Sequence, residues 1–202
     1  MIVICGTQRS GTSLIARFIS ECGYDLGTEF WDDRLDGGFE NPDVCNFFRE
    51  FTQLPDFPFK GYWNMIEPRE VFVPLASLNL QVVKFSYLLM APSFPPAWYS
   101  ARRNQDRFVI MWRPIKDIIK SKNSRPEIFR AEDSSFLTQS ERQLFLNRKR
   151  SLMHMEKFGM DYKLFDFPVV DDIVDQLQDY TGLSLSQKVW DNLFDKNKIH
   201  FK

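Results

Sequence analysis

Hydrophobic residues recur along the chain with two different periods, and these periods predict the secondary structure. Short apolar runs with β-branched residues predict buried parallel strands at residues 2–5, 81–85 and 108–111, and residues 162–165 are a fourth strand candidate. Between these runs the apolar residues recur at intervals of three and four, which is typical of amphipathic helices. The helices expected from this spacing cover approximately residues 12–22, 42–51, 114–122, 138–158, 169–180 and 186–194.

Local signals define the ends of several of these helices. Asn41 followed by Pro42 is typical of a helix N-terminus, because asparagine caps the first amides and proline fits the first turn. Thr138 and Glu141 fit a capping box for the long helix. Gly182 and, earlier in the chain, Gly23 are expected to end helices. Loops or irregular segments are expected at residues 24–40, at the proline-rich stretches 55–68 and 86–96, and at 123–137, a polar stretch that is a candidate mobile lid.

The alternation of strands and helices predicts the fold class. It favours a three-layer α/β domain in which a mostly parallel sheet carries helices on both faces. No repeat and no linker divides the chain, so residues 1–202 are expected to form a single domain. In such sheets, ligands bind outside the carboxyl ends of the strands.

Composition and charge exclude several classes of protein. Hydrophobic residues make up 44% and charged residues 26%, which excludes a disordered or fibrous chain. No apolar run is long enough to cross a membrane. The net charge of -1 argues against a nucleic-acid partner. Three cysteines and two histidines lack the spacing of a zinc site, and no signal peptide is recognisable, so a reducing, cytoplasmic location is expected.

A glycine loop between the first strand and the first helix is the clearest chemical signal. Gly6 and Gly11 have the G-x-x-x-x-G spacing of a Walker A loop, but Thr12 stands where that motif has lysine, and the cation is Arg9 inside the loop. Amide groups at such a helix N-terminus point at an anion, and the helix dipole favours negative charge there. The alternative is an ordinary glycine turn.

Cations also follow the other core strands. Lys84 ends the second strand and Arg113 follows the third, so that with Arg9 three cations lie where the ligand should bind. No carboxylate ends these strands, whereas nucleotide kinases usually hold Mg²⁺ with one. The pattern predicts a site for a multiply anionic ligand that is bound without metal. A surface lysine at Lys84 and a structural salt bridge at Arg113 are the alternatives.

In this order, the motifs resemble those of the sulfotransferases that use 3′-phosphoadenosine 5′-phosphosulfate (PAPS), in their bacterial and glycan-type form. The loop from Gln8 to Ser13 is similar to the family's 5′-phosphosulfate loop. The spacing of Arg113, Asp117 and Ser121 is similar to the 3′-phosphate motif, although the proline stands one residue after the arginine instead of two. Two further similar segments are Gly38-Phe39-Glu40-Asn41 and Val83-Lys84.

The resemblance implies a P-loop NTPase-like fold and a role for each matched residue. Lys84 would lie near the sulfuryl group, Arg113 and Ser121 would hold the 3′-phosphate, and the 5′-phosphosulfate would be held by Arg9, Ser10, Gly11, Thr12 and Ser13. Ser86 stands where cytosolic members have a catalytic histidine, so the base is expected elsewhere, and Glu40 is the candidate. A carboxylate that only stabilises the following helix N-terminus is the alternative for Glu40.

The function expected from the resemblance is metal-independent, in-line sulfuryl transfer from PAPS to a hydroxyl, with an amine as the less favoured acceptor and PAP as the product. Arg9 and Lys84 would neutralise charge on the sulfuryl and bridging oxygens, and the acceptor would be a small molecule or a carbohydrate. The alternatives are a P-loop kinase of a small metabolite and a non-catalytic nucleotide-binding module.

Three further features of the sequence are open to more than one interpretation. His154 is interpreted as structural, because it lies among apolar residues in a predicted helix. The basic run at residues 148–150 is interpreted as a solvated helix face, with binding of an anionic acceptor as the alternative. Trp31, Tyr62 and Trp63 could stack on an adenine or a sugar.

Overall fold

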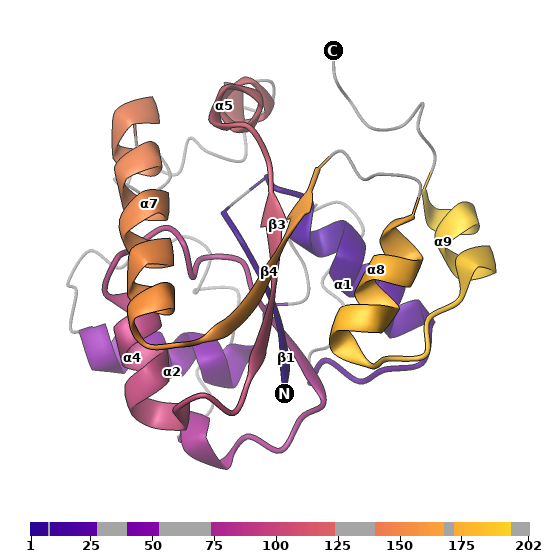
Figure 1. Cartoon of the computed structure of the whole chain (residues 1–202), viewed down its shortest axis with the longest axis horizontal. Coiled ribbons are helices and arrows are strands. Elements are labelled where there is room, and N and C mark those ends of the chain that lie inside the picture. The colour runs from indigo at the N-terminus through magenta and orange to yellow at the C-terminus, as the bar shows by residue number, and fades with distance from the viewer. Residues whose placement is uncertain (8, 28–39, 53–73, 124–139, 168–171, 195–202) are drawn as a thin grey trace.

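A four-stranded parallel sheet forms the centre of the molecule (Figure 1). The structure is a computed structural model that describes residues 1–7, 9–27, 40–52, 74–123, 140–167 and 172–194. The strands lie in the order β2-β1-β3-β4, and every neighbouring pair is parallel. Their bounds are β1 Ile2–Cys5, β2 Val82–Phe85, β3 Arg107–Trp112 and β4 Asp161–Asp166. All four predicted strands are present, and the predicted α/β class is confirmed.

Helices cover both faces of the sheet, as Figure 1 shows. One layer contains α2 (Pro42–Thr52), α4 (Phe94–Arg102), α7 (Glu141–Lys157) and the short 3₁₀ helix η1 (Leu75–Ser77). The other contains α1 (Thr12–Glu21), α8 (Ile173–Thr181) and α9 (Gln187–Leu193). Helix α5 (Ile115–Asn123) follows β3 at the carboxyl end of the sheet. Among the described residues, no helix is long and apolar enough to cross a membrane.

Alternating side chains of the strands divide the core into two apolar clusters. Val3 and Phe108 face the α2/α4/α7 layer, whereas Ile4 and Val109 face α1, α8 and α9, because successive side chains of a strand point to opposite faces. The first cluster contains an aromatic group in which Phe48 stacks on Phe85 with ring centroids 4.5 Å apart. Seven phenylalanines are among the buried core residues of the described part of the chain.

The prediction of a loop throughout the proline-rich stretch after residue 85 was wrong, because helix α4 occupies residues 94–102. Pro95 and Pro96 lie in its first turn, where proline is tolerated since the amides there have no acceptor within the helix. The buried side chains of Phe94, Ala97 and Trp98 have the spacing of one helical face. Burial of that face in the core stabilises the helix, although the prolines in the sequence had indicated a loop.

The helix caps confirm one predicted terminus and correct another. The Asn41 side-chain oxygen accepts hydrogen bonds from the amides of Asp43 (3.0 Å) and Val44 (3.1 Å), which confirms it as the cap of α2. At α7 the capping box is formed by Ser140 and Gln143 instead of Thr138 and Glu141, so the helix begins later than predicted. Of the predicted loop or irregular segments, 55–68, residues 28–39 of 24–40 and residues 124–137 of 123–137 lie outside the described residues, as do Trp31, Tyr62 and Trp63.

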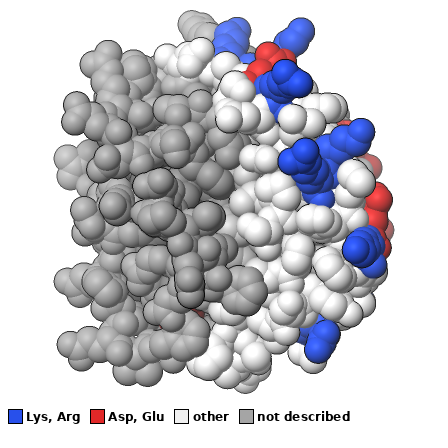
Figure 2. Space-filling model, turned by 90° about the vertical axis from the view of Figure 1, so that its left-hand side faces the viewer, with Lys and Arg blue, Asp and Glu red and all other residues white. Residues whose placement is uncertain are grey.

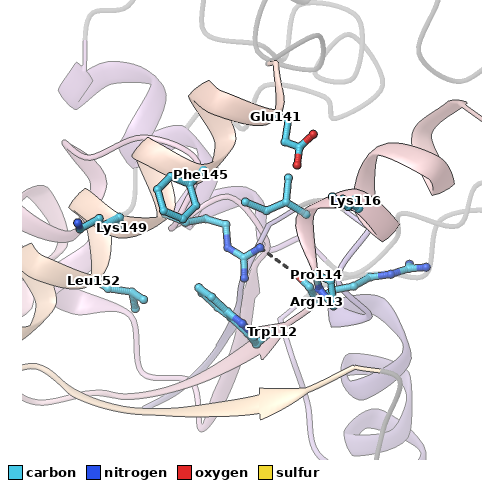
Figure 3. A pocket seen from close by; sticks show the side chains of 10 residues that line it. Trp112, Arg113, Pro114, Lys116, Glu141, Phe145, Lys149 and Leu152 are labelled. Carbon is cyan, nitrogen blue, oxygen red and sulfur yellow. Dashed lines mark hydrogen bonds between the residues drawn. The ribbon is translucent and has the colours of Figure 1, made fainter.

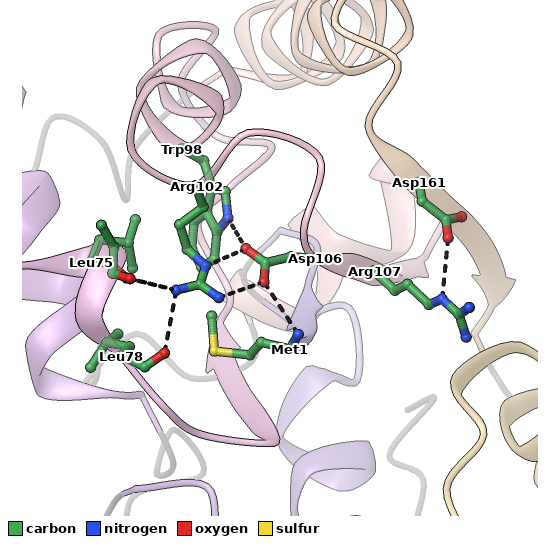
Figure 4. A network of polar contacts seen from close by, with 9 residues as sticks. Met1, Leu75, Leu78, Trp98, Arg102, Asp106, Arg107 and Asp161 are labelled. Carbon is green, nitrogen blue, oxygen red and sulfur yellow. Dashed lines mark hydrogen bonds and ion pairs between the residues drawn. The ribbon is translucent and has the colours of Figure 1, made fainter.

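A buried polar network joins the start of β1 to α4 and η1 (Figure 4). Asp106 accepts hydrogen bonds from Arg102 Nε (2.6 Å), Arg102 Nη2 (3.0 Å) and Trp98 Nε1 (2.8 Å). The Met1 amino group lies 3.3 Å from the same carboxylate. Arg102 also donates to the carbonyl oxygen of Leu75 at 2.9 Å. The charges are therefore compensated in a region from which water is excluded, as burial requires.

Candidate functional site

The loop between β1 and α1 can pass close to its neighbours only because it has glycine at two positions. A Cβ atom at Gly6 would lie 2.8 Å from the carbonyl oxygen of Met111. Gly11 has a φ of 93°, and a Cβ there would lie 2.4 Å from the ring of Phe167. Gly11 is the N-cap of α1, so the first amides of that helix have no side-chain cap. This leaves the helix N-terminus suited to an anion.

The hydroxyl groups of the loop have different partners. Ser10 Oγ is buried and donates to the carbonyl oxygen of Thr7 at 2.6 Å, so this side chain stabilises the loop from within. Thr12 Oγ1 lies 2.8 Å from Ser86 Oγ, and Ser13 Oγ accepts a hydrogen bond from Lys84 Nζ at 3.1 Å. The start of α1 is therefore joined to the end of β2 by two side-chain contacts.

Glu40, the predicted base, and Lys84, predicted to lie near the sulfuryl group, form a buried ion pair. Residue 40 pairs with Lys84 as an isolated parallel bridge, which places Glu40 beside the end of β2. Lys84 Nζ lies 2.9 Å from Glu40 Oε1, and the amide of Ser86 donates to Glu40 Oε2 at 3.0 Å. Lys84 is 1% exposed and Glu40 is 8% exposed, so the pair is almost fully removed from water. Both carboxylate oxygens have a donor, and these contacts fix the orientation of Glu40.

Cys5 lies at the end of β1, next to this ion pair. Burial, with a smaller contribution from the Glu40 carboxylate, raises the pKa of the Cys5 thiol well above its ordinary value. The thiol therefore stays protonated near neutral pH and is a poor nucleophile. This makes Cys5 a core residue and leaves the chemistry to the polar groups around it.

Arg9, Arg113 and Ser121 come together at the other side of the loop. Arg9 has a φ of 63° and its Nε donates to Ser121 Oγ at 3.1 Å. Arg113 Nη1 donates to the carbonyl oxygen of Arg9 at 2.8 Å. Burial lowers the pKa of Arg113; the Asp117 carboxylate opposes this change, and the nearby charge of Arg9 adds to it. An anion bound between the two guanidinium groups would relieve their repulsion.

The structure therefore divides the predicted site residues into two clusters. We call Lys84, Glu40, Ser13, Thr12 and Ser86 the β2 cluster, and Arg9, Arg113 and Ser121 the α5 cluster. Ser10 and Gly11 belong to the loop between them. The side chain of Arg9, which was expected near the sulfuryl group, contacts the serine that was expected to hold the 3′-phosphate. Among the described residues, no group of His, Cys, Asp and Glu side chains could hold a metal ion.

Comparison with known proteins supports the fold and leaves the family open. No protein-family model matches the chain, and no curated protein matches its sequence. Among solved structures, it is similar to a sulfotransferase domain from the curacin biosynthetic pathway, with a TM-score of 0.50 and 12% sequence identity. The similarity covers 94% of this chain and 76% of that domain. The chain has the fold of a sulfotransferase domain.

Two residues that the sequence did not single out complete this end of the sulfotransferase-like fold. The Phe167 ring contacts the Gly11 position, and the Arg113 guanidinium carbon lies 5.3 Å from the ring centroid. The guanidinium of Arg148 stacks on the Trp112 ring, with the guanidinium carbon 3.4 Å from the ring centroid. Both aromatic residues lie at the carboxyl ends of strands, and this position was the only signal in the sequence that could have identified them.

Helix α7 holds the segment that follows Ser86. Asn147 Nδ2 and Ser151 Oγ donate to the carbonyl oxygens of Met90 (2.9 Å) and Ala91 (3.4 Å). His154 Nδ1 lies 2.7 Å from the carbonyl oxygen of Pro92. This contact agrees with the interpretation of His154 as structural. Through these contacts α7 fixes the segment directly after Ser86, the residue that contacts Thr12 in the β2 cluster.

Proposed function

We propose that this protein transfers a sulfuryl group from PAPS to the hydroxyl of a small molecule or carbohydrate. The observation that carries the proposal is the presence of cations on either side of one helix N-terminus, two arginines in the α5 cluster and the lysine of the Glu40–Lys84 ion pair in the β2 cluster. The α5 cluster supplies two guanidinium groups for a 3′-phosphate, and the β2 cluster supplies an ammonium group for a sulfuryl group. The amides at the start of α1 suit the 5′-phosphate between them. A nucleotide with anionic groups at both its 3′ and 5′ positions fits this distribution of charge.

The proposed reaction is an in-line displacement at sulfur. The acceptor oxygen forms a bond to sulfur while the bond from sulfur to the 5′-phosphate oxygen breaks, and its electron pair leaves with PAP. The acceptor proton passes to the Glu40 carboxylate. Lys84, held against Ser13 and Glu40, places positive charge where the bridging oxygen becomes negative. As in phosphoryl transfer, positioning and charge stabilisation do most of the work.

Binding of PAP provides the direct test. PAP is expected to raise the melting temperature of the protein, because a ligand that binds only the native state stabilises it by mass action. EDTA is expected to leave this shift unchanged, since side-chain cations neutralise the phosphates. Differential scanning fluorimetry with PAP, PAPS, ATP with Mg²⁺, and NAD measures both effects. A metal-dependent kinase would be favoured if EDTA abolished the rise in melting temperature with PAP, or if only ATP with Mg²⁺ raised the melting temperature. A non-catalytic module would be favoured if PAP bound but no acceptor was turned over.

The variant Arg113→Ala tests which phosphate this arginine binds. We expect it to weaken PAP by about ten- to a hundredfold, the cost of one charge-assisted contact. Adenosine 5′-phosphosulfate lacks the 3′-phosphate, so its affinity should change far less. Isothermal titration calorimetry with both ligands measures the difference, and Arg103→Ala at an exposed position serves as the control. Equal weakening of both ligands would show that Arg113 does not bind the 3′-phosphate.

A further inference from the structure

A cavity of about 480 Å³ lies between the end of β3, the start of α5 and helix α7 (Figure 3). Its apolar wall includes Trp112, Pro114, Phe145 and Leu152. Phe145 is 54% exposed, so its side chain is accessible from this cavity. Arg113 lines the cavity and also belongs to the α5 cluster, so the cavity adjoins the proposed donor site.

Arg148 is a buried cation in this cavity. Its guanidinium stacks on Trp112, its Nη1 donates to the carbonyl oxygen of Arg113 at 2.8 Å, and it is 3% exposed. The Nε atom is buried without a hydrogen-bond partner, and no carboxylate of the described residues forms an ion pair with this arginine. Burial lowers the pKa of Arg148 to about 10, so it remains charged at neutral pH. A buried charge of this kind is stabilised by a bound anion.

Most of the charged residues that line the cavity are basic. Four cations line it (Arg113, Lys116, Arg148 and Lys149), against the single carboxylate of Glu141. Figure 2, which views the side that α7 covers, shows Lys and Arg side chains at separate points on a mostly uncharged described surface, with acidic side chains beside some of them. The sequence predicted that the basic run at 148–150 forms a solvated helix face. Lys149 and Arg150 are exposed, as predicted, but the prediction is wrong for Arg148, which is buried. The cavity surface is mainly apolar, and the charged ends of Arg113 and Lys149 point away from it in Figure 3, so its main charged group is the guanidinium of Arg148 over Trp112.

We propose that this cavity binds the acceptor, and that the acceptor is an elongated organic anion with a flat apolar body. Its identification as the acceptor site rests on the proposed function. The apolar body would pack against Phe145 and Leu152, and its anionic group would pair with Arg148 at the floor formed by Trp112. The hydroxyl to be sulfated would lie at the opposite end of the molecule, directed towards the β2 cluster.

The sheet register explains why the acceptor must be elongated. Lys84 and Val109 both pair with Ile4, so Trp112 lies three residues beyond the level of Lys84. Strands β2 and β3 are separated by β1, which places the two residues about 10 Å apart across the sheet and about 10 Å apart along it. A compact acceptor would not reach from Arg148 to the β2 cluster, whereas two linked rings would.

The test compares two biphenyl compounds that differ in one charge. 4′-Hydroxybiphenyl-4-carboxylate is expected to bind at least about tenfold more tightly than neutral 4-hydroxybiphenyl, because only the former pairs with Arg148. In Arg148→Met the difference should fall to about threefold or less. The matched control Arg150→Met removes an exposed arginine of the same helix and should keep the wild-type difference. Isothermal titration calorimetry without any nucleotide measures all of these affinities.

A second variant and a second ligand keep the test decisive. Phe145→Ser changes a half-exposed side chain, so it should fold normally and weaken both compounds alike. Equal affinity of the two compounds for the wild-type protein, or no loss of affinity in Phe145→Ser, would overturn the proposal.

A separate titration with PAP distinguishes failure of this site from failure of the proposed function. Binding of the carboxylate compound without binding of PAP would refute the proposed function and leave the anion site in place. Binding of PAP without binding of the carboxylate compound would refute only the site. If Arg148→Met and the wild-type protein sulfated the carboxylate compound at equal rates, the cavity would not be the acceptor site.

Discussion

Replacement of Glu40 by glutamine is expected to lower turnover by about 10²–10⁴-fold, because the variant loses the general base while its side chain keeps nearly the same shape. The affinity for PAP should remain within about threefold or become tighter, since the change removes a negative charge from a site that binds anions. The remaining rate should also lose the acid limb of its pH profile. Calorimetry with PAP and a sulfate-transfer assay measure these three effects.

The ion pair between Glu40 and Lys84 determines which control this experiment needs. Lys84 is 1% exposed, so neutralising its partner costs stability as well as basicity. Preserved PAP binding shows that the variant has folded, and Arg9→Ala gives the contrasting result, because loss of its guanidinium should reduce both PAP binding and turnover. Normal turnover of Glu40→Gln would contradict the assignment. Ser86 acting through a bound water would then be the next candidate, followed by Asp32, Asp33 and Asp36, which lie outside the described residues.

Asp106→Ala is expected to lower the free energy of unfolding by about 3–5 kcal/mol, the cost of leaving a buried charge without its partner. Asp106 is 1% exposed and accepts two hydrogen bonds from Arg102 and one from Trp98. Without the carboxylate, Arg102 keeps its charge at a position that is 8% exposed. Because single domains are stable by only about 5–15 kcal/mol, the variant should be visibly less stable. Urea denaturation followed by circular dichroism measures the loss.

An exposed pair in α1 provides the matched control. Arg17 and Glu21 have the same i,i+4 spacing as Arg102 and Asp106, and Arg17 Nε lies 2.9 Å from Glu21 Oε1. Both side chains are more than one third exposed, so Glu21→Ala should change the free energy of unfolding by only a few tenths of a kcal/mol. Similar losses in the two variants would show that burial of the Asp106 network adds nothing to stability.

The sequence alone determined the features that depend on neighbouring residues. Apolar runs such as residues 2–5 identified the strands, because a parallel strand that is covered on both faces must be apolar throughout. The spacing of Gly6 and Gly11 identified the turn into α1, since the backbone there leaves no space for a side chain. Asn41 identified the start of α2, because capping is a contact between residues two and three positions apart. The order of these elements was sufficient to predict the α/β class.

Only the tertiary structure decided which side chains meet across the sheet. Helix α4 contradicts its local proline signal because its apolar face is buried, and Arg148 departs from its basic neighbours because Trp112 lies beneath it. Likewise, the pairing of Glu40 with Lys84 and of Arg9 with Ser121 joins residues that are 44 and 112 positions apart. Local patterns report backbone conformation and the buried face of each element. Contacts between elements depend on strand order and register, which arise only when the whole sheet has assembled.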